Sequence, residues 1–370
     1  MRVCLDFQAA IAQQAGVGRY TLLLADHLAK AAGPDQLELF FFDFKRSAAD
    51  GLPAGAEAAA VRWCPGRLAQ AAWKTLGWPP FDWFAGAADV YHFPNFILPP
   101  CRRGKRVVTI HDVSFMRHPE YTEDRNLAYL EHHIRKTVSR ADAIITDSHF
   151  SAAEIQELLH VPADRIHAIH LGISDRFTAP PEPEIRAFRA RMNLARPYLL
   201  SVGTLEPRKN YDFLIDVFEA LPQFDGDLVI AGMPGWKLDP ILKRIRTSPK
   251  AAQIRYLQYV PLQDLPSLYA GAELFAFPSH YEGFGFPPLE ALACGTPVIS
   301  STAASLPEVL DDAATLLATD SRDAWVAAIE SILQAGKGDA DRIERGCAQA
   351  RKFRWDCTAQ ETWKLYREIA

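Results

Sequence analysis

Short apolar runs alternate with amphipathic stretches of helical periodicity along almost the whole chain. This alternation is typical of parallel β-sheets built from strand–helix–strand units, because parallel neighbours need a long crossover connection. Six strands are expected before residue 172 and five after residue 198, namely RVCLDF, LELFFFDF, DVYHF, RVVTIHD, AIITDS and IHAIHLG, then YLLSVGT, DLVIAG, IRYLQYV, LFAFPS and PVISS. The Ala-rich stretch near residues 48–60 is expected to be a loop. The sequence therefore predicts an α/β protein with two doubly wound domains.

The length of the chain supports the same division. A single hydrophobic core rarely serves more than about 250–300 residues, and the chain has 370. Between residues 178 and 197 the composition changes to TAPPEPE and then to a charged, helix-like stretch, and we interpret the whole segment as a linker. The expected domains are 1–177 and 198–352, and a C-terminal helix at 353–370 is long enough to pack back on the first domain. A cleft between the domains is the default place for a ligand.

Composition and charge exclude several classes of protein. The formal net charge is −5, so there is no general basic surface for nucleic acid, and no stretch approaches the ~20 consecutive apolar residues of a membrane-spanning helix. Residues 1–7 resemble a strand more than a signal peptide, so we expect a cytoplasmic protein. The six cysteines contain no Cys-x-x-Cys pair. Buried free thiols are therefore expected, with neither a zinc site nor disulfides.

One basic cluster and one aromatic run stand out in the first domain. The segment CRRGKR places four basic residues, from Arg102 to Arg106, ahead of a strand. A second segment is rich in aromatic residues, namely Trp73, Trp78, Phe81, Trp83 and Phe84. A solvated loop and a hydrophobic core are the ordinary explanations. If both segments are exposed, they form a surface suited to anionic lipid headgroups, so a peripheral contact with the cytoplasmic face of the inner membrane stays open.

The densest chemical signal is the segment SHYEGFGFPPLEALACGTPVISS. Glu282 follows a predicted strand, and Gly283 and Gly285 flank Phe284 in a turn where the backbone can approach a ligand. A Pro-Pro pair then begins a helix that holds Glu290 in its first turn. Backbone amides at such a helix start suit a diphosphate, and ionised carboxylates suit sugar hydroxyls. One glutamate would then hold a hexose and the other a ribose.

An isolated pair of glutamates is more often structural, with Glu290 complementing the helix dipole and Glu282 capping a turn. Here the glutamates are separated by seven residues and are followed by CGTPVI. Together these features resemble the signature of family 4 of the retaining glycosyltransferases. The resemblance implies the GT-B fold, with two facing Rossmann-like domains and an interdomain cleft, and a nucleotide-sugar donor bound by the second domain.

The resemblance extends to SVGTLEPRKNYDFLI, which opens the second domain. In the family a lysine at this place contacts the donor diphosphate, which implies that role for Lys209. Arg208 would add a second positive charge, although a surface salt bridge is the plainer explanation for it. Many members carry an arginine directly after the turn glycine, where this chain has Thr204. Cations here would offset the charge that builds up on the departing nucleotide.

Two further segments of the first domain match the family. QQAGVGRYT places Gly16 and Gly18 before a helix, but Thr21 stands where a dinucleotide fingerprint needs its third glycine, which weakens an NAD-binding interpretation. In the family this loop closes over the donor phosphates, which implies backbone contacts for both glycines. TIHD places His111 at a strand end, where the family has a histidine near the reacting sugar. We expect Asp112 to orient His111 or to cap the following turn.

The resemblance implies a retaining hexosyltransferase that needs no metal and no cofactor. Glu282, at the donor sugar, and His111, near the developing positive charge, are the implied catalytic residues, and the leaving phosphate itself accepts the proton of the acceptor. Glu290 would hold the ribose of the donor. No Asp-x-Asp pair stands at the end of a predicted strand, where metal-dependent transferases present one.

The motif wording most resembles bacterial mannosyltransferases of surface-polysaccharide assembly. It implies GDP-mannose as the donor and a glycan or a lipid-linked sugar as the acceptor; another hexose donor remains open. Two other functions stay as alternatives. A sugar-nucleotide epimerase on the same fold would act without an acceptor, and a carbohydrate-binding protein would bind without catalysis.

Overall fold

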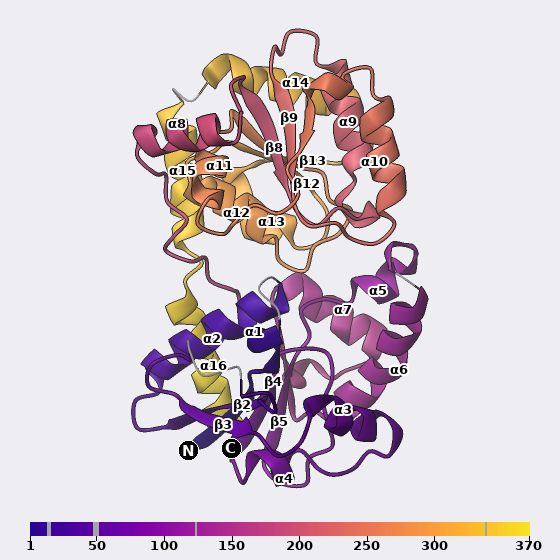
Figure 1. Cartoon of the computed structure of the whole chain (residues 1–370), viewed down its shortest axis with the longest axis vertical. Coiled ribbons are helices and arrows are strands. Elements are labelled where there is room, and N and C mark those ends of the chain that lie inside the picture. Colours follow the sequence, from indigo (N-terminus) through magenta and orange to yellow (C-terminus); the bar gives the residue numbers. More distant parts are fainter. Residues whose placement is uncertain (13–15, 47–51, 123, 337–338) are drawn as a thin grey trace. The chain divides into compact units, whose positions relative to one another are not determined.

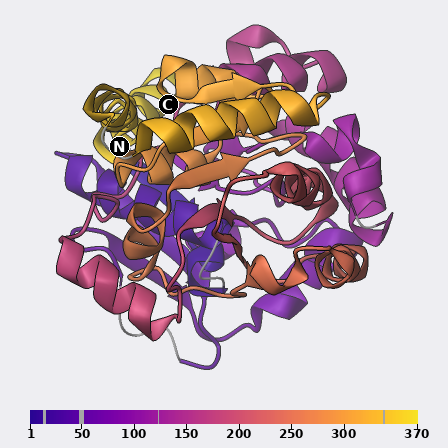
Figure 2. The same cartoon turned by 90° about the horizontal axis from the view of Figure 1, so that it is seen from above.

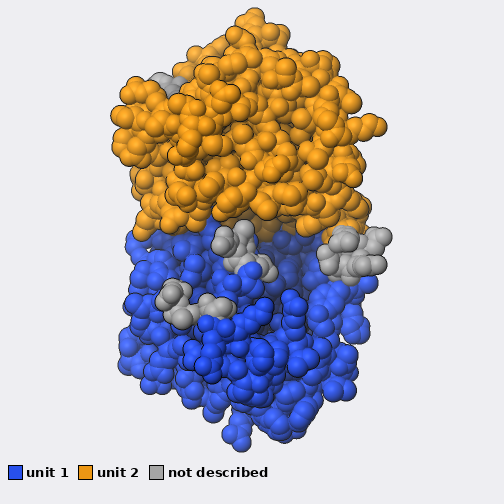
Figure 3. Space-filling model, viewed as in Figure 1, with its two compact units in different colours: residues 1–116, 124–172, 354–370 blue, residues 117–123, 173–353 orange. Residues whose placement is uncertain are grey.

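The computed structural model describes residues 1–12, 16–46, 52–122, 124–336 and 339–370 (Figure 1). The chain forms two compact units, coloured separately in Figure 3: unit 1 contains residues 1–116, 124–172 and 354–370, and unit 2 contains residues 117–123 and 173–353. Each unit is built around one parallel β-sheet. Apart from residues 117–123, the chain stays in unit 1 up to Gly172, and it returns to unit 1 with its last helix.

Within the described residues, the sheet of unit 1 has seven parallel strands in the order β3-β2-β1-β4-β5-β6-β7. Their bounds are β1 (Arg2–Asp6), β2 (Gln36–Phe42), β3 (Glu57–Val61), β4 (Val90–Phe93), β5 (Lys105–Thr109), β6 (Ala143–Thr146) and β7 (Ile166–Ala168). The strand order reverses between β1 and β4, and we call this place the switch point of unit 1. In open α/β sheets, ligands bind outside the carboxyl ends of the strands at such a point.

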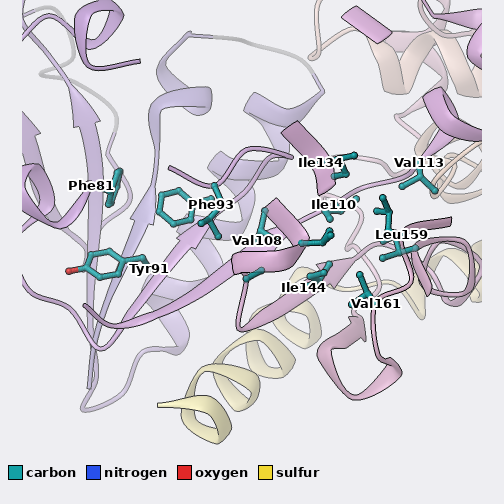
Figure 4. Packing of buried hydrophobic residues seen from close by; sticks show 14 of the residues in the cluster. Phe81, Tyr91, Phe93, Val108, Ile110, Val113, Ile134, Ile144, Leu159 and Val161 are labelled. Carbon is teal, nitrogen blue, oxygen red and sulfur yellow. The ribbon is translucent and has the colours of Figure 1, made fainter. Parts of the chain in front are cut away.

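Helices cover both faces of this sheet, because successive side chains of a strand point to opposite faces. On β4, Tyr91 and Phe93 join a large hydrophobic cluster that also takes in Ile134 (Figure 4). His92, between them on the strand, contacts Tyr366 on the other face of the sheet. The helices of this part of the chain are α1 (Gln8–Ala12), α2 (Val17–Ala31), α3 (Gly66–Thr75), α4 (Asp82–Ala85), α5 (Ser114–Arg117), α6 (Asp124–Arg140) and α7 (His149–Leu159).

The last helix of the chain, α16 (Trp355–Ile369), packs against α2 in unit 1. Trp355, Trp363 and Tyr366 are each at most 2% exposed. The indole N–H of Trp363 donates to the carbonyl oxygen of Leu28 at 2.9 Å, and the hydroxyl of Tyr366 lies 2.5 Å from Nδ1 of His92. The C-terminal segment therefore completes the core of a unit whose other residues come from the first half of the chain.

Within the described residues, unit 2 has six parallel strands in the order β10-β9-β8-β11-β12-β13, so its switch point lies between β8 and β11. The strands are β8 (Tyr198–Val202), β9 (Asp227–Ala231), β10 (Ile254–Tyr256), β11 (Leu274–Phe277), β12 (Val298–Ser301) and β13 (Thr315–Leu317). The helices are α8 (Glu182–Arg191), α9 (Tyr211–Ala220), α10 (Leu238–Thr247), α11 (Leu265–Ala270), α12 (Phe286–Ala293), α13 (Leu306–Leu310), α14 (Arg322–Ala335) and α15 (Ala340–Arg351). The long helix α14 packs on this sheet beside α9 (Figure 2).

All eleven strands expected from the sequence are present, but two further strands were missed. β3 lies in the Ala-rich stretch that was expected to be a loop; residues 47–51 of that stretch are outside the described residues. Alanine has a low strand propensity, and β3 forms because each of its residues pairs in register with β2. β13 has only three residues and pairs with β12, so its sequence carries too short a pattern to recognise.

The segment 178–197, interpreted as a linker, contains α8, which is part of unit 2. Ile185 and Phe188 on this helix are buried, and α8 packs on α11. The prolines that suggested a linker stand instead around the helix start, where Pro183 occupies the first turn and needs no amide partner.

None of the described helices combines the length and the apolar character needed to cross a lipid bilayer. All six cysteines fall within the described residues and are free thiols. Cys4 and Cys294 are buried as expected, but Cys357 is exposed, because it lies on the solvent face of α16 beside the exposed Gln360 and Glu361. The other three cysteines are half-buried.

Candidate functional site

Charged residues gather at the carboxyl ends of β8 and β11, at the switch point of unit 2. β8 leads into Gly203 and then into a short 3-10 helix, Pro207–Lys209, while β11 leads into the loop that carries Glu282. The backbone N–H of His280 donates to the carbonyl oxygen of Arg208 at 2.8 Å, which joins the two loops. The parallel sheet thus brings together side chains that are 73 residues apart in sequence.

Glu282 is the centre of a group of four charges, Glu206, Arg208, Lys209 and Glu282, which we call the Glu282 cluster; Arg208 is half-buried and the other three are buried. The ammonium of Lys209 donates to Oε1 of Glu282 at 2.6 Å, and Nη1 of Arg208 lies 3.0 Å from Oε2. Arg208 also contacts Oε1 of Glu206 at 2.6 Å. The side chains of Glu282 and Lys209 are each 9% exposed. Two cations and two carboxylates leave the cluster without net charge.

Burial and these contacts together shift the pKa values of Glu282 and Lys209. Burial raises the pKa of Glu282, but the positive charges of Arg208 and Lys209 outweigh it and lower the pKa to about 2. Burial lowers the pKa of Lys209, and the negative charge of Glu282 opposes that change. Glu282 is therefore ionised at neutral pH and can act only as a hydrogen-bond acceptor.

The turn after Glu282 is held in a conformation that requires glycine. Gly285 has φ of +106°, and a Cβ there would lie 2.8 Å from Cδ2 of Leu306. The hydroxyl of Ser305 donates to the carbonyl oxygens of Glu282 at 2.8 Å and Phe284 at 3.0 Å. The turn is thus fixed from both sides, and the carboxylate of Glu282 is positioned by rigid backbone.

Glu290 lies further along α12 than the sequence analysis predicts. The helix begins at Phe286, one residue before the Pro-Pro pair, so Glu290 is its fifth residue and stands beyond the first turn. The side chain is buried, and the hydroxyl of Tyr269 donates to its Oε2 at 2.9 Å. Glu282 and Glu290 therefore bond to different side chains.

In unit 1, His111 is held by a carboxylate from the neighbouring strand. His111 follows β5 and Asp147 follows β6, and Nδ1 of the imidazole lies 2.9 Å from Oδ2 of Asp147. The ring of Tyr20 meets the imidazole edge-on at 4.6 Å. Burial lowers the pKa of His111, but the Asp147 carboxylate raises it more, so the net shift is upward.

The sequence analysis missed Asp147 as the group that orients His111. Asp112, one of the two candidates for that role by position, caps the following turn by accepting from the N–H of Ser114 at 2.9 Å. The signal for Asp147 was available, because the predicted strands before His111 and Asp147 are consecutive and their ends would meet at one edge of a parallel sheet.

Gly16 and Gly18 stand at the start of α2 in unit 1. Gly16 has φ of +57°, a left-handed conformation that glycine adopts without strain, and Gly18 is buried. Residues 13–15 of the same segment are outside the described residues. The contact of these glycines with a donor phosphate stays a prediction, as do the roles of His111 and of the Glu282 cluster.

Comparisons with known proteins agree for both halves of the chain. The family described as "Glycosyltransferase Family 4" matches residues 15–177, and "Glycosyl transferases group 1" matches residues 184–349. The O-antigen chain mannosyltransferase B of Escherichia coli is 36% identical over 370 residues, which cover 95% of this chain and 96% of that protein.

Solved structures agree on the fold. Sucrose-phosphate synthase from Thermosynechococcus elongatus matches with a TM-score of 0.76 at 20% identity, covering 100% of this chain and 99% of that one. Anabaena HepE in complex with UDP-glucose matches with a TM-score of 0.72 at 18% identity, covering 99% of this chain and 100% of that one.

Proposed function

The chain belongs to the family 4 and group 1 glycosyltransferases and has their GT-B fold, and from this premise we propose that it transfers mannose from GDP-mannose to a glycan or lipid-linked acceptor in polysaccharide synthesis, with retention at the anomeric carbon. The observation that carries the proposal is the Glu282 cluster at the switch point of unit 2. Mannose is supported by the similarity to an O-antigen chain mannosyltransferase. A nucleotide-sugar donor is supported by the HepE complex with UDP-glucose.

The charges of the Glu282 cluster suggest how the donor binds. The diphosphate brings negative charge to a cluster that is already neutral, so it must take Lys209 or Arg208 as a partner in place of Glu282. The carboxylate of Glu282 then accepts bonds from hydroxyls of the mannose. Every charged group keeps a partner before and after binding, which avoids the cost of a buried unpaired charge. Glu290 accepts from the ribose.

The proposed chemistry needs positioning and charge stabilisation. As the bond between mannose and phosphate breaks, negative charge grows on the departing GDP, and Lys209 and Arg208 offset it. The leaving phosphate accepts the proton of the acceptor hydroxyl on the same face of the sugar, which retains the configuration. His111, oriented by Asp147, is proposed to lie near the reacting sugar, and Gly16 and Gly18 to contact the donor phosphates. No metal and no cofactor is assigned a role.

A screen of nucleotide sugars tests the donor and the reaction together. GDP-mannose should raise the melting temperature of the protein and should be consumed in the presence of an acceptor, with the product linkage in the same anomeric configuration as the donor by NMR. A chelator should leave the rate unchanged. Preference for a UDP-sugar contradicts the donor, an inverted product contradicts retention, and conversion of the donor alone into another nucleotide sugar favours the epimerase.

We also propose a peripheral contact with an anionic membrane through unit 1. The residues of the aromatic run differ in exposure. Phe81 is 1% exposed and packs in the core, whereas Trp78 and Trp83 are 50% and 57% exposed. Trp83 lines one surface hollow together with Arg102 and Arg103, and both arginines are exposed. Exposed aromatic rings beside basic groups suit the headgroup region of an anionic bilayer.

A further inference from the structure

A cavity of about 310 Å³ lies at the carboxyl ends of β1 and β4, at the switch point of unit 1. Asp6, the last residue of β1, and Pro94, the first after β4, line its base, and α1, α3 and α6 supply the walls. We call it the β1–β4 cavity. All its lining residues belong to unit 1, whereas the Glu282 cluster belongs to unit 2. It occupies the place where open α/β sheets bind ligands.

One face of α6 turns four side chains toward this cavity. Tyr129, His133, Lys136 and Arg140 follow one another at spacings of four, three and four residues, which places them on one side of a helix. Tyr129 and His133 are in ring contact at 4.4 Å. The helix therefore presents an aromatic face at one end and cations toward the other.

The helix α3 adds a second aromatic residue and another cation. The indole N–H of Trp73 donates to the carbonyl oxygen of Pro79 at 2.6 Å, which fixes the orientation of the ring. The ammonium of Lys74 lies 4.6 Å from the centre of the Tyr129 ring, so α3 and α6 meet at this point. Flat, fixed aromatic rings of this kind stack against the apolar face of a sugar.

The electrostatic character of the cavity is positive. Among the described residues, no carboxylate lies within ion-pair distance of Lys74, Lys136 or Arg140, and Asp6 is the one acidic residue of the lining. Burial lowers the pKa of His133, and the charges of His132, Lys74 and Lys136 lower it further. Neighbouring cations that have no carboxylate within ion-pair distance attract an anion.

Asp6 contributes a carboxylate, which can accept hydrogen bonds that the cations of the cavity cannot. Its Oδ1 accepts from the backbone N–H of Gln8 at 3.1 Å, which orients the carboxylate at the end of β1. An oriented carboxylate has further lone pairs for sugar hydroxyls. The cavity thus combines an acceptor for hydroxyls, two aromatic faces and a group of cations.

We propose that the β1–β4 cavity binds the acceptor as a saccharide that carries a phosphate group. The sugar ring lies against Trp73 and Tyr129 with a hydroxyl bonded to Asp6, and the phosphate is held by Lys136 and Arg140. The inference rests on the proposed function, since a transferase needs a site for its acceptor, and it names the chemical class that the donor site leaves open. The phosphate belongs either to a free sugar phosphate or to the link between a glycan and a lipid.

Calorimetric titration of the full chain tests this with three probes: mannose 1-phosphate, methyl α-mannoside and mannosyl farnesyl phosphate. Mannose 1-phosphate should bind at least about tenfold tighter than the neutral glycoside, since a charge-assisted hydrogen bond is typically equivalent to about tenfold or more in affinity. Lys136→Gln should remove about tenfold of this preference and leave the affinity for methyl α-mannoside unchanged. Tighter binding of the farnesyl compound assigns the lipid-linked source, and equal binding assigns the free sugar phosphate.

The matched control is Arg135→Gln, which removes a neighbouring charge on the exposed side of the same helix. Equal affinity for the charged and neutral mannosides, or equal loss in both variants, overturns the proposal. Lys209→Gln separates this result from the proposed function. It should abolish stabilisation by GDP-mannose while leaving the titration with mannose 1-phosphate intact. Loss of mannose 1-phosphate binding in Lys209→Gln, with none in Lys136→Gln, moves the anion site to unit 2.

Discussion

At the scale of single residues, Glu282 holds two cations that have little contact with water. Replacing Glu282 with Gln leaves Lys209 and Arg208 charged beside a neutral group. Breaking a buried ion pair from one side typically costs about 3–5 kcal/mol. We expect Glu282→Gln to lower the free energy of unfolding by about 3 kcal/mol, measured by denaturant titration, and to abolish mannose transfer.

The double variant Lys209→Met with Glu282→Gln distinguishes the two effects. It removes a charge from each side of the pair, so it should regain much of the lost stability while transfer stays absent. A single variant that is as stable as the native chain contradicts the role of the Glu282 cluster in folding. Normal turnover in that variant contradicts its role in donor binding.

Asp6 shows the opposite electrostatic behaviour from Glu282. Burial raises the pKa of Asp6 from 3.8 to about 6, so the folded chain favours the protonated form. This contribution to stability is fully present below pH 3.8 and is lost as the pH rises through 6. Asp6→Asn, which keeps the acceptor for Gln8, should therefore unfold at a higher temperature than the native chain at pH 7 and at a similar temperature at pH 4.

Melting curves at both pH values check the prediction for Asp6. The native chain and Asp6→Asn should differ by several degrees only at the higher pH, in line with about 1–2 kcal/mol. Glu38→Gln is a suitable control, because Glu38 is paired with Arg2 at 2.6 Å on the neighbouring strand. A constant difference across the pH range excludes ionisation of Asp6 as its cause.

At the scale of elements, the sequence predicted the strands that lie within apolar runs, including the short edge strands β7 and β10. β3 was not predicted, because it forms through its pairing with β2, which outweighs the low strand propensity of its alanines. α8 lies in a stretch of helical character that was interpreted as a linker, because proline and glutamate suit both a linker and a helix start. Only the burial of Ile185 and Phe188 shows that it belongs to unit 2. Strand and helix propensities depend on the local sequence, whereas the structures of β3 and α8 depend on the segments that they pack against.

The features of the two candidate sites also fall into those that local motifs predict and those that depend on the arrangement of the strands. Lys209, Glu282 and Glu290 could be proposed from motif spacing, because each stands at a fixed offset from a strand or turn. Asp147 and the β1–β4 cavity depend on which strands are neighbours in the sheet, and neighbouring strands there are not always consecutive in the chain. The partner of His111 was accessible from consecutive strands, whereas the cavity joins β1 to β4 across two intervening strands in sequence.

The helix α16 allows a test of how each unit is stabilised. Trp363 on α16 and Trp325 on α14 are both buried and both donate from the indole, to Leu28 and to Ala318. Replacing a buried tryptophan with alanine typically costs about 3–5 kcal/mol. Trp363→Ala should raise hydrogen exchange in the strands of unit 1, and Trp325→Ala in those of unit 2. Equal effects on both sheets in either variant show that the units do not unfold separately.

At the scale of the whole molecule, the two switch points carry different charge. The Glu282 cluster is neutral and would have to exchange partners to admit the proposed diphosphate, whereas the β1–β4 cavity keeps Lys74, Lys136 and Arg140 without carboxylate partners among the described residues. The first arrangement suits a ligand that is selected by its sugar as well as its phosphates. The second suits direct attraction of an anion, and its affinity should fall more steeply with salt.

The proposed membrane surface of unit 1 should bind anionic lipid bilayers in preference to neutral ones. The chain should sediment with vesicles that contain phosphatidylglycerol and remain in solution with phosphatidylcholine alone, and binding should weaken as salt shortens the Debye length. Arg102→Gln with Arg103→Gln should weaken binding by roughly tenfold or more, because each basic residue near an anionic surface contributes about 1 kcal/mol. Trp78→Ala with Trp83→Ala should reduce the part of the binding that persists at high salt.

Tyr259→Ala in unit 2 is the control for these variants, because Tyr259 is 54% exposed and lies away from the basic segment in sequence. It should bind vesicles like the native chain. Equal binding to neutral and anionic vesicles, or an equal loss in Tyr259→Ala, contradicts the assignment of this surface. Retained thermal stabilisation by GDP-mannose in all three variants separates the membrane contact from the donor site, because the substitutions are remote from the Glu282 cluster in sequence and only Tyr259 shares its unit.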